Sequence, residues 1–343
     1  MRIVNVMTSK KNQLYGAQKA AIDYAVALSN LGHEVFFIVH DPLMINSYIK
    51  KNNNIKLIKV RKRLLWFVKE RFVLLKIKPH AIIHHNHFSF HRYAAVGISQ
   101  IIAVGHNTFI KTPKNFYKYD KIICFTEETK QMHVKDGIKN SKIFVIPNMV
   151  YPVIANKKSI KENKIPIIGY IGRLEPVKNI HTLVEAFKLL KDQNILFKAI
   201  IAGTGSQKAE LESLVKRYKL SDRIEFPGYI KNAPDQFYSR IDLFCSLSYA
   251  EGFALTGLEA FSAKLPCLFS NIPCFSKLSN NGENALITNN KNPVDVKNDL
   301  EKILNNNELR NKMRENAYQY YLKNHTPSII AKKLETMIGS DEL

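Results

Sequence analysis

The chain has 343 residues, of which 45% are apolar, so it is long enough for two globular domains with cores of their own. Its net charge is +22, from 51 Lys and Arg against 29 Asp and Glu, which favours an anionic partner: nucleic acid, membrane surface or phosphorylated substrate. No apolar stretch approaches the roughly 20 residues that span a bilayer, and the N-terminus reads as a strand and not as a signal peptide, so we expect a cytoplasmic protein.

Short apolar runs rich in β-branched residues alternate with helical patterns along the whole chain. This alternation is typical of parallel sheets that helices cover on both faces, and it predicts an α/β protein with two doubly wound units. The predicted strands are Ile3 to Met7, Val35 to Val39, Ala81 to His84, Ile122 to Phe125, Ile167 to Ile171, Phe197 to Ala202, Leu243 to Ser246 and Pro266 to Phe269.

The predicted units meet at a polar stretch rich in Lys and Asn that lies between Pro152 and Pro166. We expect the first unit at residues 1–150, a linker at 151–165 and the second unit at 166–321. The tail from Tyr318 to Ile338 has a helical pattern in which Pro327 is either a break or a first helical residue. We expect the segment from about residue 322 to 343 to pack back on the first unit.

The first unit contains a strongly basic segment. Residues 51–79 hold ten Lys or Arg and a single acid, Glu70. Helical spacing from Arg61 to Lys76 gives a basic stripe and an apolar stripe with the chain's one Trp at its edge; the apolar stripe is Leu64, Leu65, Val68, Phe72 and Leu75, and the basic one Lys62, Lys69 and Lys76. Such a helix can lie in an anionic membrane interface, which would make Lys51–Lys78 a membrane contact. The alternative is an ordinary helix whose apolar stripe packs on the sheet.

Cysteine and histidine spacing does not favour a metal site. The four cysteines, Cys124, Cys245, Cys267 and Cys274, lie in or near apolar runs without CxxC spacing, which indicates reduced packing residues. Six of the eleven histidines lie between His80 and His106. The spacing of His87 and His91 would suit metal ligands on one helix face, but no cysteine or acid is near them, so we expect a cleft-lining loop and no metal.

Two cations follow the first strand of the second unit. Arg173 and Lys178 stand beyond the carboxyl end of Ile167 to Ile171, where open α/β sheets bind ligands. Arg offers a planar fork and Lys a point charge, a combination that suits a diphosphate, although two solvated loop cations are the alternative. No Asp-x-Asp pair occurs in the chain to chelate a metal, so these cations would offset the charge of a departing nucleoside diphosphate.

Glu251 and Glu259 lie eight positions apart around the start of an apolar helical pattern. The small residues between them would direct backbone N–H groups into a helix N-terminus, where partial positive charge favours a phosphate. Each carboxylate can accept hydrogen bonds from vicinal hydroxyls. The pattern favours a sugar nucleotide, and the alternative is a helix cap with acidic residues in its first turns.

These motifs, in this order, resemble a known family. They are similar to motifs of the retaining glycosyltransferases of family 4. The four motifs are Gly-Arg-Leu-x-x-x-Lys-Asn from Gly172, Gly-x-Gly from Gly203, Gly-Tyr-Ile from Gly228 and Glu-Gly-Phe-x-Leu-Thr-x-Leu-Glu-Ala from Glu251. The resemblance implies the GT-B fold, in which two Rossmann-like domains face each other across a cleft. In the first half, the segments that resemble the family are Tyr15 to Ala20, Leu31 to Val35 and Val145 to Asn148.

The resemblance also implies roles for individual residues. Arg173 and Lys178 would hold the donor diphosphate and Glu251 the hydroxyls of the donor sugar, while His106 stands where the family has an active-site histidine. The remaining donor-binding residues that it implies are Gly16, near the diphosphate and the acceptor, Gly203, Ile230 beside the base, the backbone around Phe253, Ala254, Leu255 and Thr256, and Glu259 on the ribose hydroxyls.

The implied activity is that of a retaining, metal-independent hexosyltransferase. It would move a sugar from a nucleoside diphosphate donor, expected to be UDP-linked, to a glycan acceptor, expected to be lipid-linked, in cell-envelope polysaccharide or lipopolysaccharide synthesis at the inner face of the cytoplasmic membrane. No cofactor beyond this co-substrate is expected. One alternative is a GT-B epimerase that acts on sugar nucleotides. Another is a nucleic-acid-binding protein, which the charge suggests but no RRM, KH or zinc-finger signature supports.

The chain departs from the family pattern at three places. It has one Gly and not two near Gly16, it has Lys264 where a Gly is usual, and Ser270 to Pro273 replaces a loop that contains Gly. These departures leave the acceptor and the donor sugar open.

Overall fold

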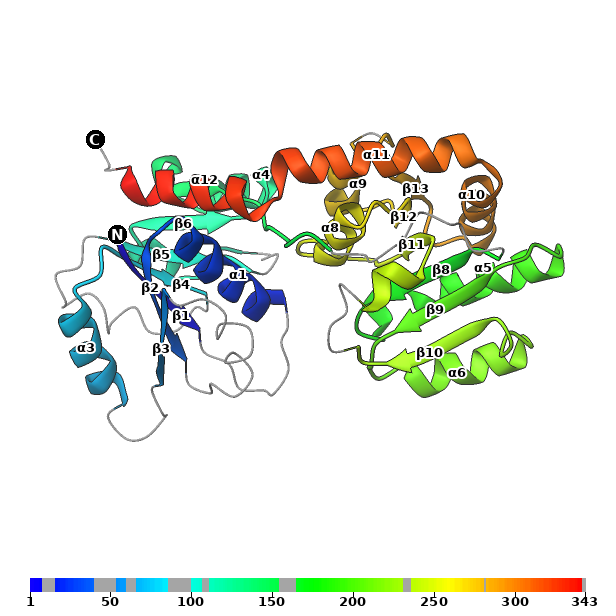
Figure 1. Ribbon diagram of the computed structural model, residues 1–343, viewed down its shortest axis with the longest axis horizontal. Coiled ribbons are helices and arrows are strands. Elements are labelled where there is room, and N and C mark those ends of the chain that lie inside the picture. Colours follow the sequence, from blue (N-terminus) through cyan, green and yellow to red (C-terminus); the bar gives the residue numbers. More distant parts are fainter. Residues whose placement is uncertain are drawn as a thin grey trace. The chain divides into compact units, whose positions relative to one another are not determined.

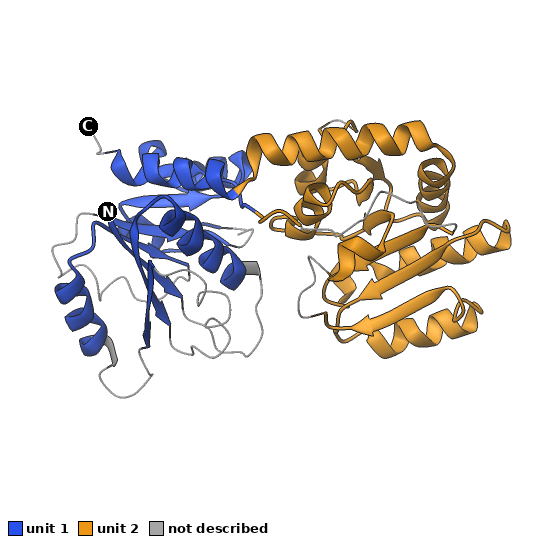
Figure 2. Ribbon diagram, in the orientation of Figure 1, with its two compact units in different colours: residues 1–149, 327–343 blue, residues 150–326 orange. Residues whose placement is uncertain are grey.

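The computed structural model describes residues 1–7, 16–39, 54–59, 66–85, 100–106, 111–153, 165–230, 236–280 and 282–340. The chain divides into two compact units (Figure 2). Unit 1 comprises Met1–Met149 with Pro327–Leu343, and unit 2 comprises Val150–Thr326. Unit 1 is therefore assembled from two separate stretches of the chain.

Unit 1 is built on a parallel sheet whose described strands run in the order β3-β2-β1-β4-β5-β6-β7 (Figure 1). The strand order reverses between β1 and β4, so the topological switch point of this sheet lies between them. The strands are β1 (Arg2–Met7), β2 (Glu34–Val39), β3 (Ile55–Lys59), β4 (Ala81–His84), β5 (Gln100–Val104), β6 (Lys121–Cys124) and β7 (Ile143–Val145), and the helices are α1 (Gly16–Asn30), α3 (Trp66–Ile77), α4 (Glu127–Lys135) and α12 (Pro327–Gly339).

Unit 2 repeats this topology. Its described strands are parallel and run in the order β10-β9-β8-β11-β12-β13, so that its switch point lies between β8 and β11. The strands are β8 (Ile167–Ile171), β9 (Lys198–Ala202), β10 (Ile224–Gly228), β11 (Leu243–Ser246), β12 (Cys267–Ser270) and β13 (Leu286–Thr288), and the helices are α5 (Ile180–Asp192), α6 (Lys208–Arg217), α8 (Leu255–Ser262), α9 (Pro273–Ser279), α10 (Pro293–Asn305) and α11 (Asn307–Asn324).

Apolar periodicity explains both layers of these units. The central strands are buried along almost their whole length because helices cover both faces of each sheet. On α5 the buried apolar residues recur every three or four positions, from Ile180 through Leu183 and Phe187 to Leu190, so one stripe of the helix faces the sheet. Each large side chain buried in this way contributes about 1.5–3 kcal/mol.

The prediction of two doubly wound α/β units is confirmed, and each of the eight predicted strands occurs with its ends shifted by one residue at most. The strands β3, β5, β7, β10 and β13 are not among the eight predicted. Both alternatives for Pro327 are correct: the helical pattern is broken there, because α11 ends at Asn324, and Pro327 is the first residue of α12.

A buried lysine fixes α12 within unit 1. Lys121 begins β6 and is only 2% exposed. Its Nζ donates to the backbone oxygen of Met337 at 2.6 Å, to the backbone oxygen of Ser340 and to Oγ of Ser340 at 3.1 Å. These carbonyl groups belong to the end of α12, where a helix leaves acceptors unsatisfied and where its dipole favours a cation.

Candidate active site

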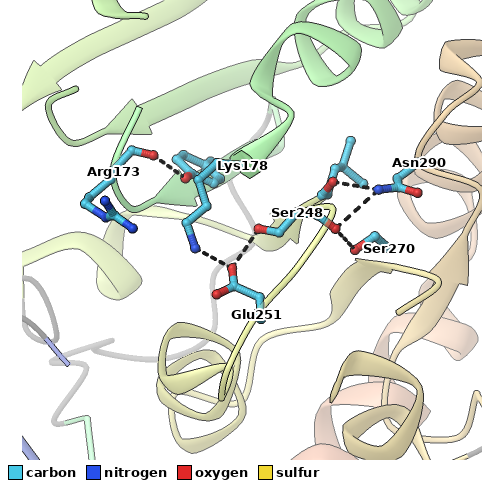
Figure 3. Close-up of polar contacts among 8 residues, drawn as sticks. Arg173, Lys178, Ser248, Glu251, Ser270 and Asn290 are labelled. Atoms are coloured by element: carbon cyan, nitrogen blue, oxygen red, sulfur yellow. Dashed lines mark hydrogen bonds and ion pairs between the residues drawn. The ribbon is translucent and has the colours of Figure 1, made fainter. Parts of the chain in front are cut away.

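Two opposite charges meet at the switch point of unit 2. Lys178 lies in the turn that follows β8, and Glu251 lies in the loop that follows the neighbouring strand β11. The distance from Lys178 Nζ to Glu251 Oε1 is 2.6 Å, and the two side chains are 16% and 17% exposed (Figure 3). Doubly wound sheets bind ligands at this position, at the carboxyl ends of the strands where the order reverses.

Ser248 holds the same carboxylate. Its Oγ donates to Glu251 Oε1 at 2.7 Å, so that oxygen accepts from both a hydroxyl and an ammonium group. Hydrogen bonds to a charged acceptor are the stronger kind and fix the carboxylate in one orientation. Within the described residues both donors bind Oε1, which leaves Oε2 for the hydroxyls of a ligand.

Two side chains, one at the end of β12 and one just after β13, hold the backbone at Ser248 by hydrogen bonds (Figure 3). Ser270, at the end of β12, donates from Oγ to the Ser248 backbone oxygen at 2.7 Å. Asn290, which follows β13, donates from Nδ2 to the backbone oxygen of Leu247 at 2.9 Å and to that of Ser248 at 3.3 Å. All three polar side chains are buried, so this network is shielded from water.

The loop that carries Lys178 joins the same network. Asn179 has the left-handed conformation, with φ +53°, and its Nδ2 donates to the backbone oxygen of Asn290 at 2.6 Å. The backbone N–H of Tyr249 donates to the backbone oxygen of Val177 at 2.8 Å. The ammonium group and the carboxylate are therefore set at a fixed separation by one set of buried hydrogen bonds. Sequence reasoning missed Ser248 and Asn290, and it noted Ser270 only as a departure from the family pattern.

Arg173 lies after the same strand as Lys178, but its side chain is exposed. Its backbone oxygen accepts a hydrogen bond from the Tyr170 hydroxyl at 3.0 Å (Figure 3). Burial, with a smaller contribution from the Glu251 charge, raises the pKa of Tyr170, so this hydroxyl stays protonated and keeps the turn in place. The guanidinium group extends from a fixed backbone into solvent at the edge of the site.

The glycines of Gly203-Thr204-Gly205 are required by the protein's own backbone. A Cβ at Gly203 would lie 1.8 Å from the Gly172 backbone oxygen, and one at Gly205 would lie 2.3 Å from that of Leu174. Gly203 also has φ +135°, which L side chains rarely adopt. The loop after β9 thus crosses directly over the loop that leads to Lys178, and this close contact accounts for both glycines.

The N-terminus of α8 has no side-chain cap. Its N-cap residue is Ala254, which offers no side-chain acceptor; α5, α6 and α9 also lack such a cap, whereas side-chain oxygens cap α4, α10 and α11. The first N–H groups of a helix need acceptors, and here a ligand phosphate can supply them. Other predicted donor residues nearby are only half-buried, namely Phe253, Leu255 and Thr256, while Ile230 is half-buried beyond β10.

Glu259 lies on α8 and is 7% exposed. Its Oε2 is 2.9 Å from the hydroxyl of Tyr238, which is also 3.0 Å from the backbone oxygen of Thr256. Burial first, and then the charge of Glu259, raise the pKa of Tyr238 far above its ordinary value, so the hydroxyl is a permanent donor. Tyr238 thus orients the carboxylate to which the family resemblance gives the ribose hydroxyls, and the sequence did not indicate this role of Tyr238.

The predicted histidine lies in unit 1. His106 follows β5, and its Nε2 is 3.0 Å from Nδ1 of His85, which directly follows β4. The Nε2 of His85 is 3.0 Å from Oδ1 of Asn5 on β1. Gly16 is the first residue of α1 in the same unit. Tyr15, His87 and His91 lie outside the described residues.

Cysteines and acids form no cluster in the part of the chain that the structure describes. Cys124, Cys245 and Cys267 are buried and Cys274 is half-buried, each with a free thiol. Among the described residues no group of three or more His, Cys, Asp and Glu side chains could hold a metal ion.

Helix α3 presents a basic and apolar surface to solvent. Phe72 is 68% exposed and Leu75 is 43% exposed, while Leu74 and Ile77 pack into the core of unit 1. The interpretation that the stripe with Phe72 and Leu75 packs on the sheet is therefore wrong for these two residues, because another side of the helix faces the core. The exposed cations on or next to this helix are Lys69, Arg71, Lys76 and Lys78. Lys51 and the residues from 60 to 65 lie outside the described part.

None of the helices described is both long and apolar enough to cross a bilayer.

Family models match both halves of the chain. The model for glycosyltransferase family 4 matches residues 15–152, and the model for glycosyl transferases group 1 matches residues 154–320. Between them they include most of the elements described above, with the Lys178–Glu251 pair inside the second match.

Two curated relatives align over long stretches. The UDP-Gal:alpha-D-GlcNAc-diphosphoundecaprenol alpha-1,3-galactosyltransferase of Escherichia coli is 27% identical over 320 residues, which are 80% of this chain and 79% of that protein. The alpha-monoglucosyldiacylglycerol synthase of Acholeplasma laidlawii is 30% identical over 236 residues, which are 68% of this chain and 57% of that protein. Several curated relatives are matched over only 33% to 58% of their length.

Among solved structures, the Anabaena protein Alr3699/HepE in complex with UDP-glucose has a TM-score of 0.82 to this chain. The likeness covers 99% of this chain and 100% of that one at 17% identity, so it concerns the fold.

Proposed function

The chain belongs to the family 4 glycosyltransferases and has their GT-B fold, and on this premise we propose that it transfers a sugar from a nucleoside diphosphate sugar to a glycan acceptor with retention of configuration. The observation that carries the proposal is the Lys178–Glu251 pair at the switch point of unit 2. A cation suits the diphosphate and a carboxylate suits sugar hydroxyls, and the two lie side by side as one donor would require.

In the proposed reaction Lys178 and Arg173 offset the negative charge that grows on the departing diphosphate, while α8 adds its uncapped N-terminal amides. Glu251 orients the donor sugar through its hydroxyls, and the acceptor hydroxyl attacks from the face that the diphosphate leaves. The cations do this work without a metal ion. His106 is the residue of unit 1 to which the family resemblance gives a part in the same reaction.

We further propose that the donor is UDP-linked. Support comes from Alr3699/HepE, which shares the fold over the whole chain and has been solved with UDP and with UDP-glucose. Glu259, held by Tyr238 in a buried position on α8, would accept from the ribose hydroxyls. Ile230, beyond the end of β10, would lie beside the base.

The proposed acceptor is a lipid-linked glycan in cell-envelope synthesis, reached from an anionic membrane surface. Support comes from the exposed Phe72 and Leu75 among the cations of α3, a combination that suits a leaflet of acidic lipids. The names of two relatives point the same way, since one acts on a diphosphoundecaprenol-linked sugar and the other is a diacylglycerol glucoside synthase.

A ligand screen with a transfer assay tests the proposal. UDP-sugars should raise the thermal midpoint of the purified protein, because a ligand that binds only the native state stabilises it. The stabilising donor should then be consumed only when a glycan acceptor is present, and EDTA should leave transfer unchanged. Interconversion of the donor without acceptor would identify an epimerase instead, and loss of transfer with EDTA, restored by a divalent ion, would exclude the metal-free reaction.

A further inference from the structure

Three polar side chains form a line across the switch point of unit 1. Asn5 lies on β1, His85 follows the adjacent strand β4, and His106 follows β5. Asn5 and His85 are buried, and each of the two links in the line is 3.0 Å long. Asn5 is the one polar residue among the buried apolar residues of its strand, where a valine or leucine would pack without unsatisfied polar atoms.

The chemistry of the three groups decides which atom donates in each of the two hydrogen bonds. The Oδ1 atom of Asn5 can only accept, so His85 must carry a proton on Nε2. Burial, and then the nearby His106 and His84, lower the pKa of His85 well below its ordinary value, so its ring is neutral and Nδ1 holds a lone pair. The Nε2 atom of His106 must then donate to that lone pair.

We propose that His85 is a positioning residue that, with Asn5 behind it, holds His106 in one orientation and in the tautomer with the proton on Nε2. The basic lone pair of His106 is thereby placed on Nδ1. A histidine is commonly fixed in this way by the partner of its other ring nitrogen, and a fixed tautomer decides whether the ring offers a donor or an acceptor. This inference rests on the proposed function only in that His106 is taken to act in the reaction.

The stability that Asn5 sacrifices supports its proposed role behind His85. Its Nδ2 is buried and has no hydrogen-bond partner among the described residues. An unsatisfied buried amide lowers stability, so an asparagine at this position is explained by what its oxygen does for His85 and not by packing.

Nitrogen NMR of the full-length protein tests the tautomer directly. With ¹⁵N-labelled histidine, long-range proton correlations distinguish a protonated ring nitrogen from a bare one, and His106→Gln identifies the His106 signals. At pH 8 the wild type should show His106 protonated on Nε2 and bare on Nδ1. Asn5→Leu and His85→Leu should each replace this with a mixture of tautomers. Tyr119→Phe is the matched control, because it removes the hydroxyl 2.7 Å from Nδ1 of the neighbouring His84 and leaves the line intact.

Kinetics then separates the inference from the proposed function. Asn5→Leu should lower kcat/KM for transfer by about 10- to 100-fold, the range known for removing the partner that orients a metal-bound histidine, with the donor KM nearly unchanged. A His106 that is protonated on Nδ1 or on both nitrogens in the wild type would overturn the inference, as would full activity of a variant with mixed tautomers. If NMR shows the expected tautomer of His106 but the protein has no transferase activity, the positioning by His85 stands and the proposed function is refuted. If His85→Leu does not fold, Asn5→Leu carries the same test.

Discussion

Lys178 Nζ and Glu251 Oε1 lie 2.6 Å apart, so the group suited to a diphosphate and the group suited to a sugar neutralise each other in the structure. Removing one partner leaves the other charge partly buried and unpaired, which is costly. A ligand that offers an anion to Lys178 and hydroxyls to the remaining oxygen of Glu251 would stabilise both charges together.

Substituting this pair tests its role in the chemical step. Lys178→Ala should lower kcat by about 10²- to 10³-fold, the usual effect of losing one preorganised group that stabilises developing negative charge. Glu251→Gln should lower turnover as well, and the double variant should lose less than the product of the two single effects because the residues share one interaction. Strictly multiplicative losses in initial-rate kinetics would show that the two residues act independently.

Asn290 should affect turnover through Glu251. Asn290→Ala removes two hydrogen bonds to the backbone before Glu251, and we expect kcat to fall while the donor still binds. The effect should disappear when the background is already Glu251→Gln. Asn289→Ala is the matched control, since Asn289 is exposed and its Nδ2 binds Asp295. An equal loss in both backgrounds would point to general destabilisation.

Glu259→Ala should weaken binding of free UDP as well as of the UDP-sugar. Loss of a charged acceptor for the ribose hydroxyls costs roughly 1.5–3 kcal/mol, which calorimetry can measure. Tyr238→Phe should weaken binding less, because it removes only the donor that orients Glu259. Unchanged affinity of Glu259→Ala for UDP would refute the ribose assignment.

Membrane contact through α3 can be measured by cosedimentation with vesicles. The protein should bind anionic vesicles, bind neutral ones weakly, and be released by salt, because each cation near the surface contributes about 1 kcal/mol. Lys69→Glu with Lys76→Glu should abolish binding, and Phe72→Ser should weaken it. Lys216→Glu with Lys302→Glu changes the net charge equally at exposed positions of unit 2 and should bind as the wild type does. Equal loss in that control would indicate a nonspecific effect of charge.

Lys121→Met should loosen the C-terminal helix. It leaves the carbonyl groups of Met337 and Ser340 without their buried donor, which should lower the free energy of unfolding by about 1–3 kcal/mol. Denaturant titration measures the loss, and limited proteolysis should cut first within α12. Lys118→Met, at an exposed position of the same unit, should change neither.

Sequence predicted the central strands because they lie between two layers of helices and are apolar throughout. Three strands that it missed lie at or near sheet edges, where this signal weakens: β3 alternates with exposed lysines, and β7 and β13 have three residues each. Edge strand β10, which is also not among the predicted strands, contains Pro227. By contrast, β5 carries the same apolar pattern as its neighbours and was predictable.

The charged residues of the candidate site were predictable because they follow strand ends, which the sequence locates. The residues that hold these charged side chains in place were not predictable. Asn290 lies 43 positions from Leu247 in the sequence, and no local pattern marks an asparagine that reaches across two strands. On α3, spacing predicted the apolar stripe that contains Phe72. It could not say which side of the helix faces the sheet, since the side with Leu74 and Ile77 is apolar too.

The division of unit 1 into two stretches has a consequence for synthesis on the ribosome. Unit 2 is continuous in sequence and can fold as soon as it has emerged, whereas unit 1 waits for α12, the last of the described helices to be made. Until then Lys121 is a charge on an otherwise apolar strand without its acceptors. The first unit to be translated is thus the last to be completed, and the nascent chain must keep the surface for α12 from aggregating while the other unit is translated.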